Sequence, residues 1–245
     1  QILIEGLLRE KGDHIFGYAG ATICPVADAL RATPQIGYTL VRTEQNAGHM
    51  ASGYARVTGK VGVCMVTSGP GATNLITGIA TAYMDSIPMV AITGQVPSHL
   101  LGRDIFQEVD ITGAVTPFTK HTYLVKDAAQ LPRIIKEAFY IASTGRPGPV
   151  LIDIPKDVQL AETEYEPASG EALIPKISMK HPMMQLRPEG EALENYKVKA
   201  QPRLEQAAQL IAEAHRPLIY CGGGVILSGA EKELLALGIE LFDEQ

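Results

Sequence analysis

Short apolar runs alternate along the first two thirds of the chain with longer segments in which apolar residues recur at helical spacing. The short runs predict strands, because they are bounded by glycine, proline or polar residues. We expect strands at 14–18, 38–42, 61–67, 89–93, 121–125 and 149–154, and helices at 2–11, 24–32, 45–58, 71–84 and 129–143. Strands that are apolar on both faces and separated by helices predict a parallel sheet covered on both sides. This pattern defines an α/β domain at 1–160.

The pattern changes after this domain. Residues 161–202 are rich in Glu, Pro and Gly, which predicts a surface linker. Helical spacing returns at 203–214, and a strand is expected at 217–220, followed by a glycine turn and a helix from about Ala230. We therefore expect 203–245 to be the start of a second α/β domain. Because both ends of the sequence fall inside such patterns, we expect a chain that is truncated at both ends.

A stretch without charged residues, from 61 to 84, is long enough to cross a membrane. The sequence Thr67-Ser68-Gly69-Pro70-Gly71 interrupts it near its middle. Glycine and proline at this spacing are typical of a turn. We therefore expect a buried strand, a tight turn and a buried helix rather than a membrane span.

Composition excludes several classes of protein. The chain has 245 residues, 46% of them hydrophobic, and a net charge of −6 without any basic run, which disfavours a nucleic-acid binder. Its three cysteines lie far apart and form no CxxC pair, which favours a reduced, cytoplasmic setting. The six histidines show no metal-ligand spacing. The P-loop, the dinucleotide fingerprint and the GxSxG elbow are absent from the sequence.

Polar and glycine-rich segments follow the first three predicted strands, at 17–20, 42–45 and 68–74. Ligands of open α/β sheets bind outside the carboxyl ends of the strands, so these segments are candidate ligand contacts. Glu44 has two interpretations: a first-turn Glu favoured by the helix dipole, or a functional carboxylate at a costly position. The Gly-Pro-Gly turn is either a tight connection or a backbone surface for a flat ligand.

Taken together, five segments resemble the thiamine-diphosphate-dependent acetolactate synthases. They are FGYAGA (16–21), VRTEQNAGHMASGYAR (41–56), the run from VTSGPGATNL to GQVP (66–97), FQEVDITG (106–113) and STGRPGPVLIDIPKDV (143–158). The resemblance implies a pyrimidine-binding domain followed by the start of a central, FAD-contacting domain. A third, diphosphate-binding domain would lie outside this chain.

The resemblance also implies roles for individual residues. Glu44 would hydrogen-bond N1′ of the aminopyrimidine and so activate the cofactor. The other implied contacts are Tyr18, Thr67, Pro70, Asn74 and Gln107 with thiamine diphosphate, Phe106 and Lys156 with substrate, and Arg146, Asp85, Gly222, Gly223 and Gly224 with a structural FAD. The family's Mg²⁺ site, a Gly-Asp-Gly followed by Asn-Asn, does not occur here, so we expect the metal ligands elsewhere and the 245-residue chain alone to be inactive.

The implied reaction is decarboxylation of pyruvate and its ligation to a second 2-oxoacid. The products would be 2-acetolactate or 2-aceto-2-hydroxybutyrate, in branched-chain amino-acid biosynthesis. The implied assembly is a homodimer or homotetramer with the site at the subunit interface and a possible small regulatory subunit, without nucleic acid or membrane. It would be cytoplasmic, or in a plastid or mitochondrion if eukaryotic.

Two alternatives remain. One is another reaction of the same scaffold: sulfoacetaldehyde acetyltransferase, pyruvate oxidase or 2-oxoacid decarboxylase. The other is a short, non-catalytic subunit. The sequence also departs from the family, which usually has Pro at the position of Ala19 and His at that of Thr43. Threonine in place of histidine at position 43 changes the polarity beside Glu44.

Overall fold

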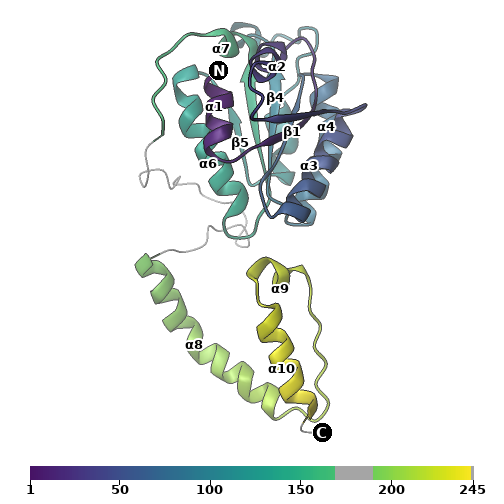
Figure 1. The fold of residues 1–245 in the computed structure, drawn as a ribbon, viewed down its shortest axis with the longest axis vertical. Helices are drawn as coiled ribbons and strands as arrows, with labels where there is room; N and C mark the ends of the chain where they lie inside the picture. The colour runs from purple at the N-terminus through teal and green to yellow at the C-terminus, as the bar shows by residue number, and fades with distance from the viewer. Residues whose placement is uncertain (169–189, 244–245) are drawn as a thin grey trace. The chain divides into compact units, whose positions relative to one another are not determined.

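The computed structural model of the chain describes residues 1–168 and 190–243. The chain divides into two compact units, 1–187 and 188–245, and each is described by itself. The first unit is a parallel sheet between two layers of helices (Figure 1). The α/β architecture expected from the sequence is therefore confirmed.

All six expected strands are present in the first unit. They are β1 (His14–Tyr18), β2 (Gly37–Leu40), β3 (Gly62–Val66), β4 (Met89–Gln95), β5 (His121–Leu124) and β6 (Pro149–Pro155). Their order is β2-β1-β3-β4-β6-β5, and every neighbouring pair is parallel. β3, β4 and β6 are buried along their whole length, whereas the edge strand β2 alternates between half-buried and exposed residues.

Helices cover both faces of the sheet. On one face lie α1 (Ile2–Arg9), α2 (Cys24–Arg31) and α6 (Leu131–Ser143), and on the other α3 (Glu44–Thr58), α4 (Pro70–Met84) and the short α5 (Ile111–Val115) (Figure 1). Each layer buries its own hydrophobic cluster, around Leu7 and Ile135 on the first face and around Ala51 and Leu75 on the second. The five longer helices confirm those expected. The short α5 and α7 (Lys156–Leu160) were not expected, because five residues are too few to show a helical period.

The uncharged stretch forms β3, a turn and α4, as the sequence predicts. Among the described residues, no helix combines the length and the apolar character that a membrane span requires.

The helices α3 and α4 pack closely at two glycines. A Cβ at Gly78 would lie 2.8 Å from the Cα of Gly48 and 3.3 Å from the carbonyl oxygen of Gln45. A side chain at either glycine would therefore push the two helices apart. This close packing fixes the spacing between the amino ends of α3 and α4.

The strand order reverses beside β1. From β1 the chain passes outward to β2, and then returns across β1 to form β3 and continue to β4. The loops that follow β1 and β3 consequently leave the sheet in opposite directions. In open α/β sheets such a reversal opens the crevice in which ligands bind.

The second unit contains α8 (Gly190–Ala212), α9 (Gly223–Ser228) and α10 (Glu231–Asp243). The helix expected from about Ala230 is confirmed as α10. Two expectations differ from the structure. Residues 217–220 form no strand, because a strand needs a neighbour to satisfy its backbone and none is described here. Helix α8 begins at Gly190 and runs through Pro202, where the sequence analysis expects a linker.

Candidate functional site

Glu44 is the first residue of α3, immediately after the residue that caps the helix. Thr43 has an extended backbone, and its hydroxyl accepts a hydrogen bond from the backbone N–H of Asn46 (3.4 Å). Thr43 is therefore an ordinary N-cap residue. Glu44 is half-buried, and its position in the first turn also fits the interpretation as a dipole-favoured Glu.

The Gly-Pro-Gly turn joins β3 to α4. Gly69 precedes the helix with φ +59°, a conformation that glycine adopts without strain, and Pro70 is the first helical residue. The proline is exposed, and Gly71 is buried beneath it. The turn therefore has the tight geometry that the sequence predicts.

The Glu44 carboxylate lies against the amino end of α4. Asn74 donates a hydrogen bond from Nδ2 to Oε2 of Glu44 (3.0 Å). Among the described residues no hydrogen bond reaches the other oxygen, Oε1. A Cβ at Gly71 would lie 3.3 Å from Oε1 and 2.6 Å from Cγ2 of Thr67, so the glycine keeps the space beside Oε1 open. One carboxylate oxygen is thus held in place, and the other is free to bind a ligand.

Thr67 and Tyr18 lie at the ends of neighbouring strands. Tyr18 ends β1, pairs with Val66 in the sheet and is 42% exposed. Thr67 is buried, and its hydroxyl lies 2.9 Å from the hydroxyl of Thr22. The structure thus places the Thr67 methyl group, rather than its hydroxyl, toward Gly71.

Thr22 links three strand ends, a role that the sequence analysis missed. Its hydroxyl pairs with that of Thr67 and accepts a hydrogen bond from the backbone N–H of Ser68 (3.0 Å). Its carbonyl oxygen accepts a bond from Nε2 of Gln159 (2.7 Å), after β6. The backbone of Thr22 also lies 2.7 Å from the position of a Cβ on Gly94, in β4. Thr22 therefore joins the loops that follow β1, β3 and β6.

The loop 102–110 lies over the Gly-Pro-Gly turn and carries Phe106 and Gln107. A Cβ at Gly69 would lie 2.8 Å from the backbone of Gln107, so turn and loop are in contact. Gln107 has φ +62° and is half-buried, whereas Phe106 is 87% exposed. The Glu108 carboxylate accepts hydrogen bonds from the backbone N–H groups of Gly102 and Ile105, which lowers its pKa.

A buried polar group lies at the ends of β4 and β6, beneath this loop. Asp153 is 1% exposed and accepts hydrogen bonds from Oγ1 of Thr93 (2.7 Å) and Nε2 of Gln95 (2.9 Å). Burial, with a smaller contribution from the carboxylate of Asp110, raises the pKa of Asp153 to about 7. Gln95 also donates to the carbonyl oxygen of Val109, at 2.8 Å. This group could not be predicted from the sequence, because hydrogen bonds between distant strands leave no local signal.

Lys156, the other predicted substrate contact, begins α7 directly after β6 and is half-buried. It shares the carboxyl edge of the sheet with Glu44, but β6 lies two strands away from β3. No hydrogen bond joins Lys156 to the Glu44 group among the described residues.

The residues predicted to contact FAD do not join Glu44. Arg146 and Asp85 precede β6 and β4, so they lie at the opposite edge of the parallel sheet. Nε of Arg146 donates to the hydroxyl of Ser86 (2.6 Å), and Asp85 pairs with Arg56. The glycines 222–224 lie in the second unit, around the start of α9.

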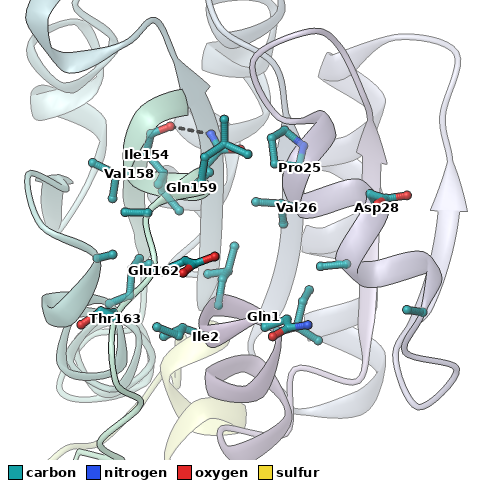
Figure 2. Close-up of a pocket in the computed structure, with 18 residues that line it drawn as sticks. Gln1, Ile2, Pro25, Val26, Asp28, Ile154, Val158, Gln159, Glu162 and Thr163 are labelled. Carbon is teal, nitrogen blue, oxygen red and sulfur yellow. Dashed lines mark hydrogen bonds between the residues drawn. The ribbon is translucent and has the colours of Figure 1, made fainter.

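A pocket of about 620 Å³ lies on the face of the sheet that α1 and α2 cover (Figure 2). Its wall includes Val26, Val158 and Glu162, and Gln159 reaches the carbonyl oxygen of Ile154 there (2.7 Å). None of the predicted site residues lines this pocket. The candidate site lies instead at the carboxyl ends of the strands, around the Glu44 carboxylate and Gly71.

Two parts of the chain match models of known protein families. Residues 1–114 match the family model described as "Thiamine pyrophosphate enzyme, N-terminal TPP binding domain", and residues 204–241 match the one described as "Thiamine pyrophosphate enzyme, central domain".

Several curated proteins align with nearly the whole chain. It is 50% identical to "Acetolactate synthase" of Arthrospira platensis over 96% of its length, and 48% identical to "Acetolactate synthase large subunit" of Corynebacterium glutamicum over 96%. It is also 48% identical to "Probable acetolactate synthase large subunit" of Methanococcus aeolicus over 99%. The chain spans 35–38% of the length of these relatives.

Proposed function

We propose that this chain, whose residues 1–114 and 204–241 match two domain models of the thiamine pyrophosphate enzymes, forms the N-terminal part of an acetolactate synthase large subunit. The proposed reaction is decarboxylation of pyruvate and ligation of the remaining two-carbon unit to a second 2-oxoacid. The products are 2-acetolactate or 2-aceto-2-hydroxybutyrate. The observation that carries the proposal is the Glu44 carboxylate, with Oε2 held by Asn74 and Oε1 open beside Gly71.

This arrangement fits the pyrimidine end of thiamine diphosphate. A flat ring needs a surface without side chains, and Gly71 leaves such space beside Oε1. A carboxylate oxygen there shares a proton with a ring nitrogen, and Asn74 keeps the carboxylate from rotating away. The bound cofactor supplies the carbon nucleophile for the reaction. Glu44 would hold the proton, Tyr18 and Pro70 would border the ring, and Gln107 would approach it from the loop that contacts Gly69.

The remaining parts of the proposal concern groups outside this crevice. Mg²⁺ and the cofactor's diphosphate would be held by a part of the enzyme beyond these 245 residues. FAD would be structural, with contacts at Arg146, Asp85 and the glycines 222–224. A second subunit would complete the site in a homodimer or homotetramer, because Phe106 is 87% exposed and Glu44 is only half-buried in the chain by itself.

The test uses the complete polypeptide encoded by the gene that contains this chain. With pyruvate, thiamine diphosphate and Mg²⁺ we expect 2-acetolactate, detected after acid conversion to acetoin. Glu44→Gln should lower kcat by about 10²- to 10⁴-fold, because the amide cannot share the proton. The matched control Glu164→Gln changes an exposed carboxylate and should leave kcat unchanged.

Two results would contradict the proposal: folded enzyme that forms no acetolactate, or Glu44→Gln with unchanged kcat. Acetaldehyde as the main product would instead indicate a 2-oxoacid decarboxylase. Acetyl phosphate formed from pyruvate when phosphate and O2 are supplied would indicate the oxidase. Acetyl phosphate formed from sulfoacetaldehyde and phosphate, with release of sulfite, would indicate the acetyltransferase.

A further inference from the structure

The loop 102–110 carries two proposed site residues but has few attachments to the rest of the molecule. At one side, the backbone of Gln107 contacts Gly69. Within the loop, Glu108 donates its backbone N–H to the carbonyl oxygen of Ile105 (3.0 Å). At its end, Asp110 caps α5 by accepting a hydrogen bond from the backbone N–H of Gly113 (2.9 Å). Val109 also packs against the buried cluster around Ala51 and Leu75. Apart from this apolar contact, the bonds described so far shape the loop without tying it to the centre of the sheet.

The side chain of Gln95 makes that connection. Its Nε2 donates both to the carbonyl oxygen of Val109, in the loop, and to Oδ2 of Asp153, in β6. Its Oε1 accepts the backbone N–H of Val96 (2.9 Å). The carbonyl oxygen of Val109 only accepts and the N–H of Val96 only donates, so these two partners determine the orientation of the carboxamide, and rotating it by 180° would break both bonds. Gln95 is 2% exposed, so water cannot replace the partners at low cost.

We infer that Gln95 is a positioning residue of the candidate site, tying the loop that carries Phe106 and Gln107 to the buried Asp153. Thr93 donates to the other oxygen of Asp153, whereas Gln95 is the residue that joins Asp153 to Val109. The hydrogen bonds run from Asp153 in β6 to Gln95 in β4, and from Gln95 to Val109 in the loop. The role of Gln95 in positioning substrate rests on the proposed function, whereas its role in holding the loop does not.

Gln95→Met tests the anchor, because methionine fills a similar volume without hydrogen bonds. Amide exchange, measured by NMR on the 245-residue chain, should become about tenfold faster at Ile105 and Glu108 when the loop loses one buried bond. Thr93→Val is the matched control. It removes a buried hydrogen bond to the same Asp153 but touches no loop residue, so it should change exchange at these amides by less than about twofold.

Kinetics of the complete polypeptide test the consequence for the site. Gln95→Met should lower kcat/KM for pyruvate about tenfold, and Thr93→Val by less than about twofold, if loop position governs substrate contact. Should Gln95→Met fail to fold, Gln95→Asn keeps a carboxamide that is one methylene too short to reach both partners, and the same results are expected.

The outcomes separate the two proposals. Unchanged loop exchange in the Gln95 variant, or an equal rise in Thr93→Val, would overturn the anchor. Faster loop exchange with unchanged kcat/KM would overturn the positioning role. Absence of acetolactate synthesis by the unmodified enzyme would overturn the proposed function, while the exchange result would still decide whether Gln95 holds the loop.

Discussion

The Thr22 hydroxyl has a larger structural role than a single threonine usually has. It is buried and makes hydrogen bonds with both the Thr67 hydroxyl and the backbone N–H of Ser68. Removing a hydroxyl that serves two buried partners leaves both unpaired, and an unpaired buried group costs more than a lost surface hydrogen bond. We therefore expect the Thr22 hydroxyl to contribute to the free energy of unfolding through both hydrogen bonds.

Thr22→Val should reduce the free energy of unfolding by about 1–3 kcal/mol, because valine has the shape of threonine without its hydroxyl. Urea unfolding of the 245-residue chain measures the change. Thr22→Ser keeps the hydroxyl and should lose less. The control Thr73→Val removes an exposed hydroxyl that donates to the carbonyl oxygen of Pro70, and should change stability by less than about 0.5 kcal/mol. Equal losses in Thr22→Val and Thr73→Val would contradict this interpretation.

At the scale of elements, the helices α3 and α4 act as one rigid pair. Glu44 and Asn74 belong to their amino-terminal turns, and the helices touch one turn or more beyond, at Gly48 and Gly78. The Glu44–Asn74 hydrogen bond therefore depends on a contact between glycines that carry no chemistry themselves.

Gly78→Ala should destabilise the chain by about 1–3 kcal/mol, although alanine favours helix, because its Cβ would meet the backbone of α3. Gly53→Ala is the matched control in α3. No atom lies within 4 Å of its Cβ position, so it should stabilise by about 0.5–1 kcal/mol. Thermal unfolding of both variants shows whether each substitution raises or lowers the stability of the chain. Two stabilising substitutions would show that the helices do not pack as described.

At the scale of the whole molecule, Asp153 makes stability depend on pH. Its pKa is about 7 in the folded chain, against an ordinary value near 3.8, because burial disfavours the charge. The folded state therefore binds the proton more tightly than the unfolded state does. The stability that this proton contributes is complete below about pH 4 and is lost as the pH rises through 7. The difference between 3.8 and about 7 corresponds to roughly 4 kcal/mol.

Asp153→Asn should remove this dependence, because a neutral amide resembles the protonated carboxyl. Urea unfolding between pH 4 and pH 8 should show the original chain losing up to roughly 4 kcal/mol relative to the variant. The control Asp28→Asn, at an exposed position, should follow the original chain. If the curves for the original chain and Asp153→Asn stay parallel, Asp153 does not titrate in this range.

The sequence could predict the sheet, because strands such as β3 and β4 are apolar throughout and alternate with long helices. It could also predict that Glu44 and Asn74 share one edge, since both follow parallel strands. It could not predict the contacts of Thr22 or Gln95, whose partners lie 46 and 58 residues away. The strand predicted at 217–220 was wrong because an apolar run alone does not supply a neighbour for pairing.

The order of the strands has a consequence for synthesis on the ribosome. β1 to β4 can assemble in the order in which they emerge, but β5 has no partner until β6, which lies between β4 and β5, has been made. About 30 residues separate the end of β5 from the end of β6, a few seconds of translation at roughly 5–20 residues per second. During that time β4 is an open edge that can pair with another chain. The nascent chain is therefore most vulnerable to aggregation just before Pro149–Pro155 leaves the exit tunnel, and that strand completes the sheet.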